Sequence, residues 1–245
     1  MAISKRFVAA GAATFIAGII LMFPARAAYT WFAPPELRLS GISGTVWKGS
    51  AAEGNAGGLY LRDLRWRFLP SSLFRANLVY AIESATAFGT INCDAGVTFA
   101  GNVVVRNLDS RFSLQEFRNQ FQLQGFDGSL HVQLESLELQ GGVPVAARGN
   151  IRLENLMARQ LSPDVIGDYQ ADFTSDDSGI VGAVQDLDGM LDVAGTISID
   201  SDRNYSFIGK IAALPNAPGA LTDQLRLLGS ADDRGYREFR IEGQL

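Results

Sequence analysis

Side chains suited to acid–base or nucleophilic chemistry are scarce in this sequence. His131 is the single histidine and Cys93 the single cysteine among 245 residues. A serine or cysteine nucleophile needs a neighbouring base, but His131 stands in a strand-like alternating run with Ser129, Gln133 and Glu135 on its polar side. We therefore expect His131 to be an ordinary solvent-facing strand residue and the chain to contain no catalytic residues.

Metal ligands are equally sparse, and we expect neither a metal nor a cofactor. Imidazole and thiolate together give two ligands, fewer than a zinc site needs. Asp200, Asp202 and Asn204 have the opening spacing of an EF-hand loop, but Tyr205 occupies its glycine position and Ile211 its bidentate acid position. This stretch therefore predicts a hairpin turn. Cys93 is expected to be a small buried apolar residue.

The strongest pattern is an uninterrupted apolar run, Phe7 to Phe23, preceded by Lys5 and Arg6. As a helix this run extends about 25 Å, the short end of what spans a bilayer core of about 30 Å. Because positive charge stays on the cytoplasmic side, we expect residues 1–6 in the cytoplasm, 7–23 as a transmembrane anchor and 28–245 in the periplasm of an inner-membrane protein. The anchor residues are Phe7, Phe15, Ile19, Leu21 and Phe23, with Tyr29, Trp31 and Phe32 at the membrane interface.

A second interpretation of the same segment stays open. Ala25-Arg26-Ala27 has small residues at the spacing that a signal peptidase recognises, so the segment could be cleaved after Ala27. The run is longer than the usual apolar region of a signal peptide, and aromatic residues follow it, which favours the anchor. A buried core helix is disfavoured because no other segment is apolar enough to enclose a helix that is hydrophobic all round.

Beyond Ala27 the composition indicates a folded, acidic, β-rich domain. Eighteen basic residues stand against 26 acidic ones, a net charge of −8, so nucleic acid is an unexpected partner. A single cysteine excludes an intramolecular disulfide. With 26 glycines, eight prolines and short alternating apolar runs, the chain is typical of many strands joined by tight turns.

These runs predict an all-β fold: a mainly antiparallel, strongly curved meander or half-pipe sheet with one or two short helices, after the transmembrane helix. SDDSG, DLDG, DSDRN and ADDRG are predicted turns. Two sublobes could meet near residues 155–168. The predicted strands cover residues 37–51 (a bulged pair), 59–69, 77–87, 88–91, 96–105, 128–140, 145–153, 169–174, 179–183, 189–200, 204–213 and 236–245.

One strand allows a prediction about its two faces. In Leu59 to Leu69, Trp66 shares a phase with Leu64 and Phe68, whereas Arg65 and Arg67 take the other phase. A one-residue slip at Asp63 predicts a bulge. We expect Trp66 to face the core.

Two short helices are expected to accompany the sheet. One begins at Ser113, which can cap it, and runs into a strand by Phe121 and Leu123. The other covers Pro218 to Gly229, where leucines 221, 225 and 228 share a face at helical spacing.

Three stretches together resemble protein N of the type II (general) secretion system: Leu39 to Ala51 (LSGISGTVWKGSA), Leu64 to Ile82 (LRWRFLPSSLFRANLVYAI) and Gly209 to Leu245. The resemblance implies a non-enzymatic accessory inner-membrane protein with a periplasmic domain. Its implied partners are other inner-membrane components of this machine, and membrane lipid through the anchor. The motif residues are structural: Gly44, Trp47, Gly49, Trp66, Pro70, Gly229 and Gly235.

The alternative is a periplasmic lipid-binding groove protein. Gly128 to Leu156 resembles the AsmA-like class, in which a concave apolar face would hold lipid tails. The same face could be covered by the two short helices, the usual arrangement on one side of an antiparallel sheet, and we favour that closed core.

Overall fold

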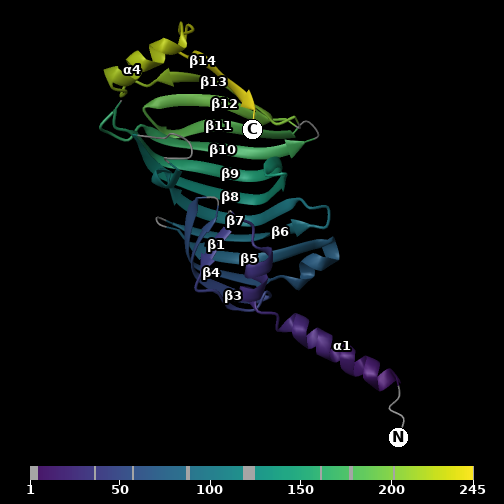
Figure 1. The fold of residues 1–245 in the computed structure, drawn as a ribbon. Coiled ribbons are helices and arrows are strands. Elements are labelled where there is room, and N and C mark those ends of the chain that lie inside the picture. Colours follow the sequence, from purple (N-terminus) through teal and green to yellow (C-terminus); the bar gives the residue numbers. More distant parts are fainter. Residues whose placement is uncertain are drawn as a thin grey trace.

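The computed structural model describes residues 5–35, 37–56, 58–86, 89–117, 125–160, 162–176, 179–200 and 202–244. Two helices, α1 (Lys5–Leu21) and α2 (Ala25–Phe32), precede a large sheet (Figure 1). The short helical segments that follow are η1 (Pro70–Arg75), η2 (Leu114–Phe117), α4 (Gly219–Leu225) and η3 (Arg226–Leu228). The strands are β1 (Leu37–Ser40), β2 (Ser43–Gly44), β3 (Lys48–Ala56), β4 (Leu59–Phe68), β5 (Asn77–Ala85), β6 (Thr90–Thr98), β7 (Val103–Ser113), β8 (Phe126–Gln140), β9 (Val143–Ala158), β10 (Gly167–Asp176), β11 (Gly179–Gly189), β12 (Leu191–Ile199), β13 (Asn204–Ala213) and β14 (Arg237–Gln244).

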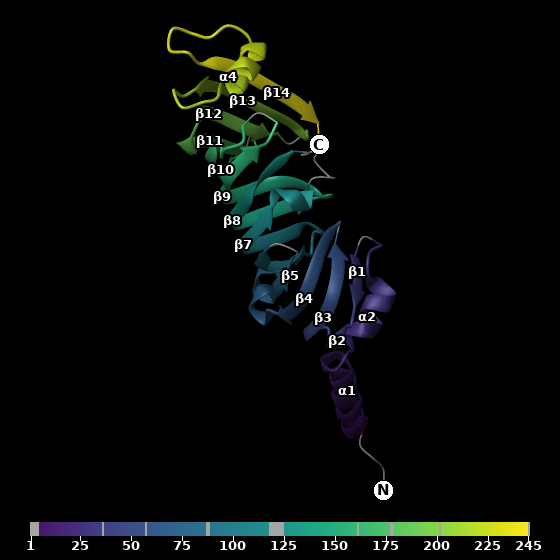
Figure 2. The ribbon, with the colours of Figure 1, turned by 90° about the vertical axis from the view of Figure 1, so that its left-hand side faces the viewer.

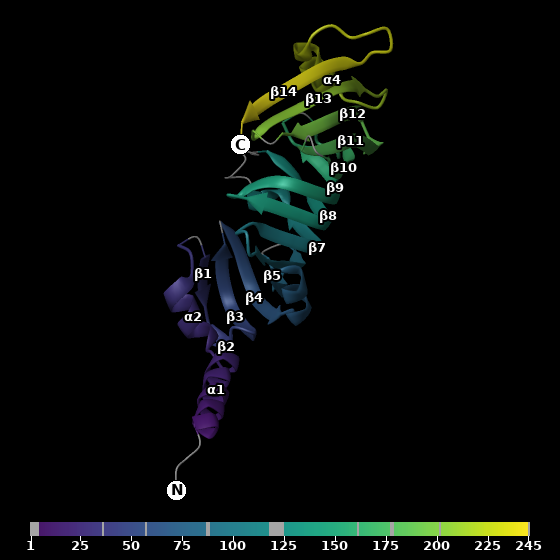
Figure 3. The same cartoon turned by 90° about the vertical axis from the view of Figure 1, so that its right-hand side faces the viewer.

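The described strands form one open antiparallel sheet, with the order β1-β3-β4 and then each following strand beside its predecessor up to β14. β2 pairs only with β3. Figures 2 and 3 show the sheet from its two sides as a long twisted ribbon, with α1 projecting from the β3 end and α4 lying at the β14 end. The antiparallel meander is thus confirmed. The sheet is also continuous near residues 155–168, because β9 pairs directly with β10.

The sheet has an inner face, which carries Leu64, Trp66, Ile82, Val132 and Val193, and an outer face, which is mostly polar. Cross-strand pairs connect the inner positions, such as Trp66 opposite Ile82 and Val193 opposite Ile211. α2 and α4 both pack on this inner face. Each covers one end of the same apolar surface.

Bulges occur where the alternation slips. Asp63 has a φ of +51°, and the register of β4 against β5 shifts between Arg62 and Arg65. The shift keeps Leu61 and Leu64 both buried, while Arg65 stays exposed. The bulge and the inward phase of Trp66 are as predicted.

Two predicted strand boundaries are wrong. Residues 96–105 are not one strand, because β6 ends at Thr98 and β7 begins at Val103. A turn lies between them, closed by the bond from the Thr98 amide to the Asn102 carbonyl (2.9 Å). The turn lies in the sequence TFAGN, where Gly101 has a φ of +89°.

The DLDG stretch is not a turn either, since β11 continues to Gly189 and the chain reverses at Met190. Asp186 remains in the strand, and its carboxylate accepts the amide of Val193 on β12 (2.8 Å). Asp186, a residue type common in turns, here accepts a backbone amide of the neighbouring strand.

The two expected short helices correspond to η2 and to α4 with η3. η2 begins after Ser113, whose hydroxyl accepts the amide of Gln115 (3.2 Å), and Phe121 and Leu123 lie outside the described residues. α4 with η3 accounts for the predicted C-terminal helix.

The apolar run near the N-terminus also differs from its predicted form. The helix in it, α1, ends at Leu21, and Pro24 separates it from α2. Among the described residues, no helix combines the length and the hydropathy of a membrane span.

Candidate functional site at the junction of α1 and the sheet

The GTVWKG motif holds the end of α1. The indole nitrogen of Trp47 donates to the carbonyl of Ile20 (2.7 Å), and the amide of Val46 donates to the carbonyl of Phe23 (3.0 Å). Pro24 forms an isolated antiparallel bridge with Thr45. The last carbonyls of a helix have few partners within the helix, and the Trp47 bond to the Ile20 carbonyl is shorter than the one that this carbonyl accepts from the Phe23 amide (3.4 Å). The motif thereby fixes the direction in which α1 leaves the sheet.

Two glycines permit this arrangement. Gly44 has a φ of +87°, and a Cβ there would lie 2.5 Å from the carbonyl oxygen of Lys48. A Cβ on Gly49 would lie 2.4 Å from the ring of Trp66. The Trp66 indole in turn donates to the carbonyl of Thr45 (3.2 Å). The motif glycines and Trp66 therefore shape the hairpin that presents Trp47 to α1.

Aromatic rings continue from this hairpin across the sheet. The ring centroids of Trp47 and Phe68 are 5.1 Å apart, and those of Phe68 and Tyr80 are 5.5 Å apart. Pro70 begins η1, in which the Ser72 hydroxyl accepts the amide of Val79 on β5 (3.2 Å). Pro70 thus starts a turn that is bonded to the same strand as Tyr80.

The apolar residues of α1 contact little of the sheet. Phe15, Ile19 and Leu21 are 70%, 50% and 67% exposed, and Phe7 lies in the first turns of the same helix. Phe23, just after the helix, is half-buried against the ring of Trp31 (5.8 Å between centroids). α1 therefore presents apolar surface that no other described element covers.

The three aromatic residues of α2 differ from one another. Trp31 and Phe32 are 66% and 77% exposed. Tyr29 instead points into the sheet, where its hydroxyl donates to the Leu37 carbonyl (3.2 Å) and accepts the Leu39 amide (3.0 Å). Sequence position alone grouped Tyr29 with the other two, but the edge strand β1 gives its hydroxyl two partners.

A cavity of about 430 Å³ lies between α2 and β1–β5. Its walls include Ala28 from α2, Leu39 from β1, and Leu61, Leu64 and Trp66 from β4. Below it, Ala51 and Leu64 form a buried cluster with Ala25 and Ile42. The alternating pattern predicted an apolar inner face, but it could not reveal that α2 leaves space above it.

The C-terminal motif fastens a loop at the other end of the sheet. The carboxylate of Asp232 accepts the amides of Arg234 (2.9 Å) and Tyr236 (2.8 Å) around Gly235, whose φ is +88°. The guanidinium of Arg237 donates to the carbonyl of Gly229 (3.1 Å). Gly229 and Gly235 thus both lie in this loop, which joins η3 to β14.

Tyr236 attaches that loop to β12. Its hydroxyl donates to the carboxylate of Asp192 (2.5 Å), and the ammonium of Lys210 lies 4.7 Å from the centre of its ring. The hydrogen bond to Asp192 raises the pKa of Tyr236, because it favours the protonated phenol.

The structure separates the two reactive side chains. Cys93 is opposite Ile82 on the inner face, whereas His131 is opposite Arg111 and Arg152 on the outer face. Burial raises the pKa of the Cys93 thiol to about 11. His131 lies 3.0 Å from the carboxylate of Asp109 (Nε2 to Oδ1). The two side chains cannot form a catalytic pair across the sheet.

The predicted hairpin turn at Asp200 is present. One carboxylate oxygen of Asp200 accepts the amides of Asp202 (2.9 Å) and Asn204 (2.8 Å), and the other accepts the side-chain amide of Asn204 (3.0 Å). The side-chain bond from Asn204 is the main reason that the pKa of Asp200 is lowered. These carboxylate oxygens therefore serve the turn. In the described part of the chain, no group of three or more histidine, cysteine or acidic residues is placed to hold a metal ion.

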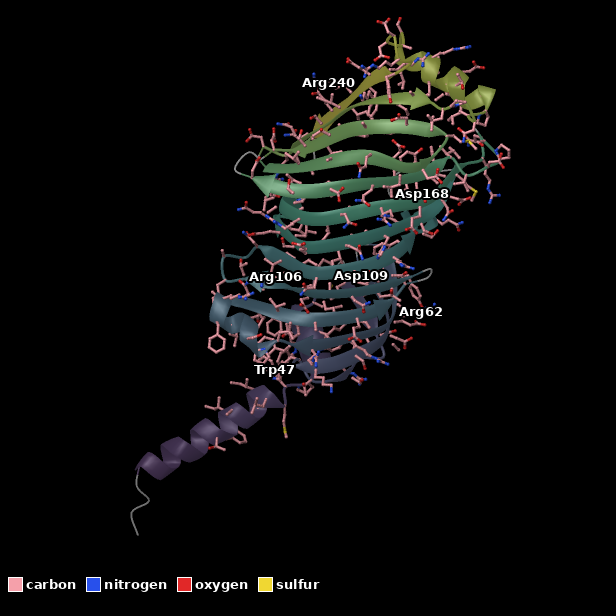
Figure 4. All side chains as sticks on the ribbon, turned by 180° about the vertical axis from the view of Figure 1, so that it is seen from behind. Trp47, Arg62, Arg106, Asp109, Asp168 and Arg240 are labelled. Carbon is pink, nitrogen blue, oxygen red and sulfur yellow. The ribbon has the colours of Figure 1, made fainter. Side chains whose placement is uncertain are left out.

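Charge is distributed unevenly along the molecule. Residues 1–85 contain nine basic and four acidic residues, a net charge of +5, and residues 86–245 contain 12 basic and 22 acidic residues, a net charge of −10. Residues 160–202 contain ten acidic residues and no basic one. Figure 4 shows the outer face, where Arg62, Arg106, Asp109, Asp168 and Arg240 project. The end that carries α1 is thus basic, and the remainder of the chain is acidic.

Comparison with known proteins identifies the family. The family model of the type II secretion system (T2SS), protein N, matches residues 35–240. The chain belongs to this family. The Type II secretion system protein N of Aeromonas hydrophila is 26% identical over an alignment of 232 residues that covers 86% of each chain. No solved structure matches the chain.

Family membership confirms the resemblance that the motifs indicated. The matched range begins after α2, so it includes the GTVWKG hairpin and the loop of Gly229 and Gly235 but not α1. The matched range thus contains the hairpin that holds α1 and the loop that fastens the last strand.

Proposed function

We propose that this chain is an accessory inner-membrane component of type II secretion, anchored by α1, that acts through protein–protein contact in the periplasm and not through catalysis. The observation that carries the proposal is the junction, in which Trp47 and Val46 bond the end of α1. Because these bonds fix α1 relative to the sheet, a membrane that holds α1 would also fix the orientation of the domain.

The exposed surface of α1 supports the anchor. Phe15, Leu21 and Met22 are 70%, 67% and 78% exposed, and a contiguous apolar surface of this kind normally meets lipid or another protein. The apolar part of α1, Phe7 to Leu21, has 15 residues and reaches about 22 Å, which is less than a bilayer core of about 30 Å, and local thinning of the bilayer accommodates such a difference. Lys5 and Arg6 then remain on the cytoplasmic side.

The packing of α2 favours retention of the anchor over cleavage. Ala25 is 5% exposed and belongs to the buried cluster beneath α2. Cleavage after Ala27 would remove Ala25 and divide α2. A reporter that is active only in the periplasm should be active when fused after Leu245. N-terminal sequencing of the mature protein should show that the chain begins before Ala28. A cytoplasmic reporter signal would refute the topology.

The anchor has a physical purpose in this proposal. Confinement to a membrane shared with the partners raises their effective concentration, so that weak contacts suffice. The partners are other inner-membrane components of the machine.

The decisive experiment releases the domain without damaging it. Residues 1–22 are replaced by a cleavable signal sequence, so that Pro24 and α2 remain, and exoprotein in the medium is measured. Secretion should fall at native abundance and recover in part on overexpression. Full secretion by the released domain at native abundance would show that tethering is dispensable.

A matched variant tests the non-catalytic part of the proposal. His131→Ala removes an outer-face side chain whose partner is the exposed Asp109. It should support secretion as well as the parent chain does. Loss of secretion in a folded His131→Ala protein would direct attention to an active or ligand-binding site on that strand.

The lipid-groove function outside secretion is the weaker candidate. Both comparisons name the secretion system. The inner face is also partly covered at each end, by α2 and by α4. A deletion strain that secretes normally but has altered envelope lipids would favour the groove.

A further inference from the structure

The lid formed by α2 is built from small residues. The positions of α2 that face the sheet are Ala25, Ala28 and Tyr29, and across from them lie Leu61 and Leu64. Two alanines above leucines leave the cavity of about 430 Å³ unfilled. This volume lies within the range of about 300–1,000 Å³ typical of small-molecule sites.

The chemistry of the walls selects an apolar ligand. The described residues that line the cavity are all aliphatic or aromatic. Two of their polar atoms are already bonded, the Tyr29 hydroxyl to β1 and the Trp66 indole to Thr45. Burial also raises the pKa of Tyr80 in the same wall. A peptide segment would bring amides that find no partners here, whereas an aliphatic chain needs none.

The position of the cavity selects the source of that ligand. Ala25 and Val46 line the cavity, and the amide of Val46 also bonds the carbonyl of Phe23 at the end of α1. With α1 in the bilayer, as the proposed function requires, this wall lies at the membrane surface. Arg26, next to Ala25 on α2, is exposed, and such a residue attracts lipid phosphate.

We propose that the cavity beneath α2 takes up one acyl chain of a phospholipid from the membrane in which α1 is anchored, with the phosphate near Arg26. The chain fills the space between α2 and β4. Because the ligand binds only when α2 is packed on the sheet, its binding stabilises that packing. The lipid and the Trp47 contact then secure the same junction from two sides.

The experiment uses the full chain and a defined probe: phosphatidylglycerol with a photoreactive diazirine at the end of one acyl chain, supplied once in vesicles and once in mixed detergent micelles. Crosslinked peptides are mapped by mass spectrometry. We expect crosslinks in the cavity walls, in residues 25–39 and 59–68, under both conditions. Crosslinks in α1 and flotation with the vesicles report the anchor separately.

Ala28→Phe is the test variant, because its ring would occupy the cavity. Thr30→Phe places the same ring on the exposed side of α2 and is the matched control. Ala28→Phe should reduce wall crosslinking by about tenfold while Thr30→Phe leaves it unchanged. Protection of α2 from protease should be retained in both, which shows that the lid is still packed.

The outcomes separate the two proposals. Crosslinks confined to α1, or wall crosslinks that Ala28→Phe does not reduce, overturn the lipid site and leave the anchor intact. Failure to float overturns the anchor, while wall crosslinks in micelles would still uphold the cavity. A secretion partner's peptide recovered from the cavity in place of lipid would also overturn the proposal.

Discussion

The two ends of the inner face are covered by lids of different kinds. α4 places Leu221 and Leu225 on β12 and β13, and these leucines are 3% and 6% exposed. α2 places alanines on β4 and leaves a cavity. The same apolar surface is therefore closed at one end and hollow at the other. The difference comes from the side chains of the lids: leucines on α4 fill the space above the sheet, whereas alanines on α2 do not.

The ends also differ in what they are tied to. The α2 end holds α1 through Trp47 and is basic, whereas the α4 end is tied to β12 through Tyr236 and follows the acidic residues 160–202. Under the anchoring by α1 that we propose, the cavity beneath α2 lies beside the bilayer and can be filled from it, whereas the α4 end lies away from it. The closed lid is expected where no lipid is available to complete the packing.

The largest effect is expected at the closed lid. Leu225→Ala should destabilise the protein by about 2–5 kcal/mol, because it removes a buried side chain and leaves a void. Leu227→Ala, at a position 80% exposed in the adjoining η3, should change stability by less than about 0.5 kcal/mol. Urea unfolding followed by circular dichroism measures both. Equal losses would mean that α4 does not close the sheet.

A pair of enlargements compares the two lids directly. Ala158→Leu adds volume to the closed cluster, where Ala158 is 3% exposed, and should cost about 1–3 kcal/mol. Ala28→Leu adds the same volume to the cavity and should be neutral or stabilise by up to about 1 kcal/mol. Thermal unfolding in detergent gives the sign. A comparable loss in both would show that the space beneath α2 is too small to use.

Alkaline pH should loosen the closed end. Burial raises the pKa of Tyr169, in the α4 cluster, to about 12, and the bond to Asp192 raises that of Tyr236. A phenol whose folded-state pKa exceeds its unfolded value of about 10 contributes stability that is complete below pH 10 and lost as the pH rises through the folded-state pKa.

The unfolding midpoint measured at increasing pH tests this expectation. Stability should decline above about pH 10, and Tyr236→Phe should make that decline shallower. An unchanged slope in Tyr236→Phe would remove this tyrosine from the explanation.

Local patterns made much of this fold predictable. Side chains alternate between the two faces of a strand, so the sequence pattern placed Trp66 inward and Arg65 outward. A one-residue slip in that pattern, at Asp63, located a bulge. The turn at Asp200 followed from side chains that bond their own backbone. Such features depend on neighbours in the chain.

What escaped prediction depends on distant contacts. Nothing in ARAAYTWF indicates that Tyr29 bonds β1, or that alanines above β4 leave a cavity. The GTVWKG motif identified the family, but its bond to Ile20 spans 27 residues. The glycines and tryptophan of the motif indicated a tightly packed segment. The fold shows that the partner of Trp47 is the end of α1.

The smallest effect concerns that bond. Trp47→Phe keeps a ring near Phe68 but removes the donor to Ile20, so it should cost about 0.5–1.5 kcal/mol locally and leave global unfolding almost unchanged. Hydrogen exchange at the Val46 amide, which bonds Phe23, should accelerate by up to about tenfold. Amides of α4, at the other end of the sheet, should exchange as in the parent protein.

Trp66→Phe separates the hairpin from the helix: its indole bonds Thr45 within the hairpin, so exchange at Val46 should rise in this variant too, whereas α1 keeps its bond to Trp47. In Trp66→Phe the amide of Met22 should keep its bond to the carbonyl of Gly18 (3.0 Å). Exchange at Met22 should therefore stay slow in Trp66→Phe and rise only in Trp47→Phe. If Trp47→Phe leaves both Met22 and Val46 protected, the indole is not what holds α1. The backbone bridge between Pro24 and Thr45 would then have to fix the helix by itself, and the two ends of the sheet would differ in their lids alone.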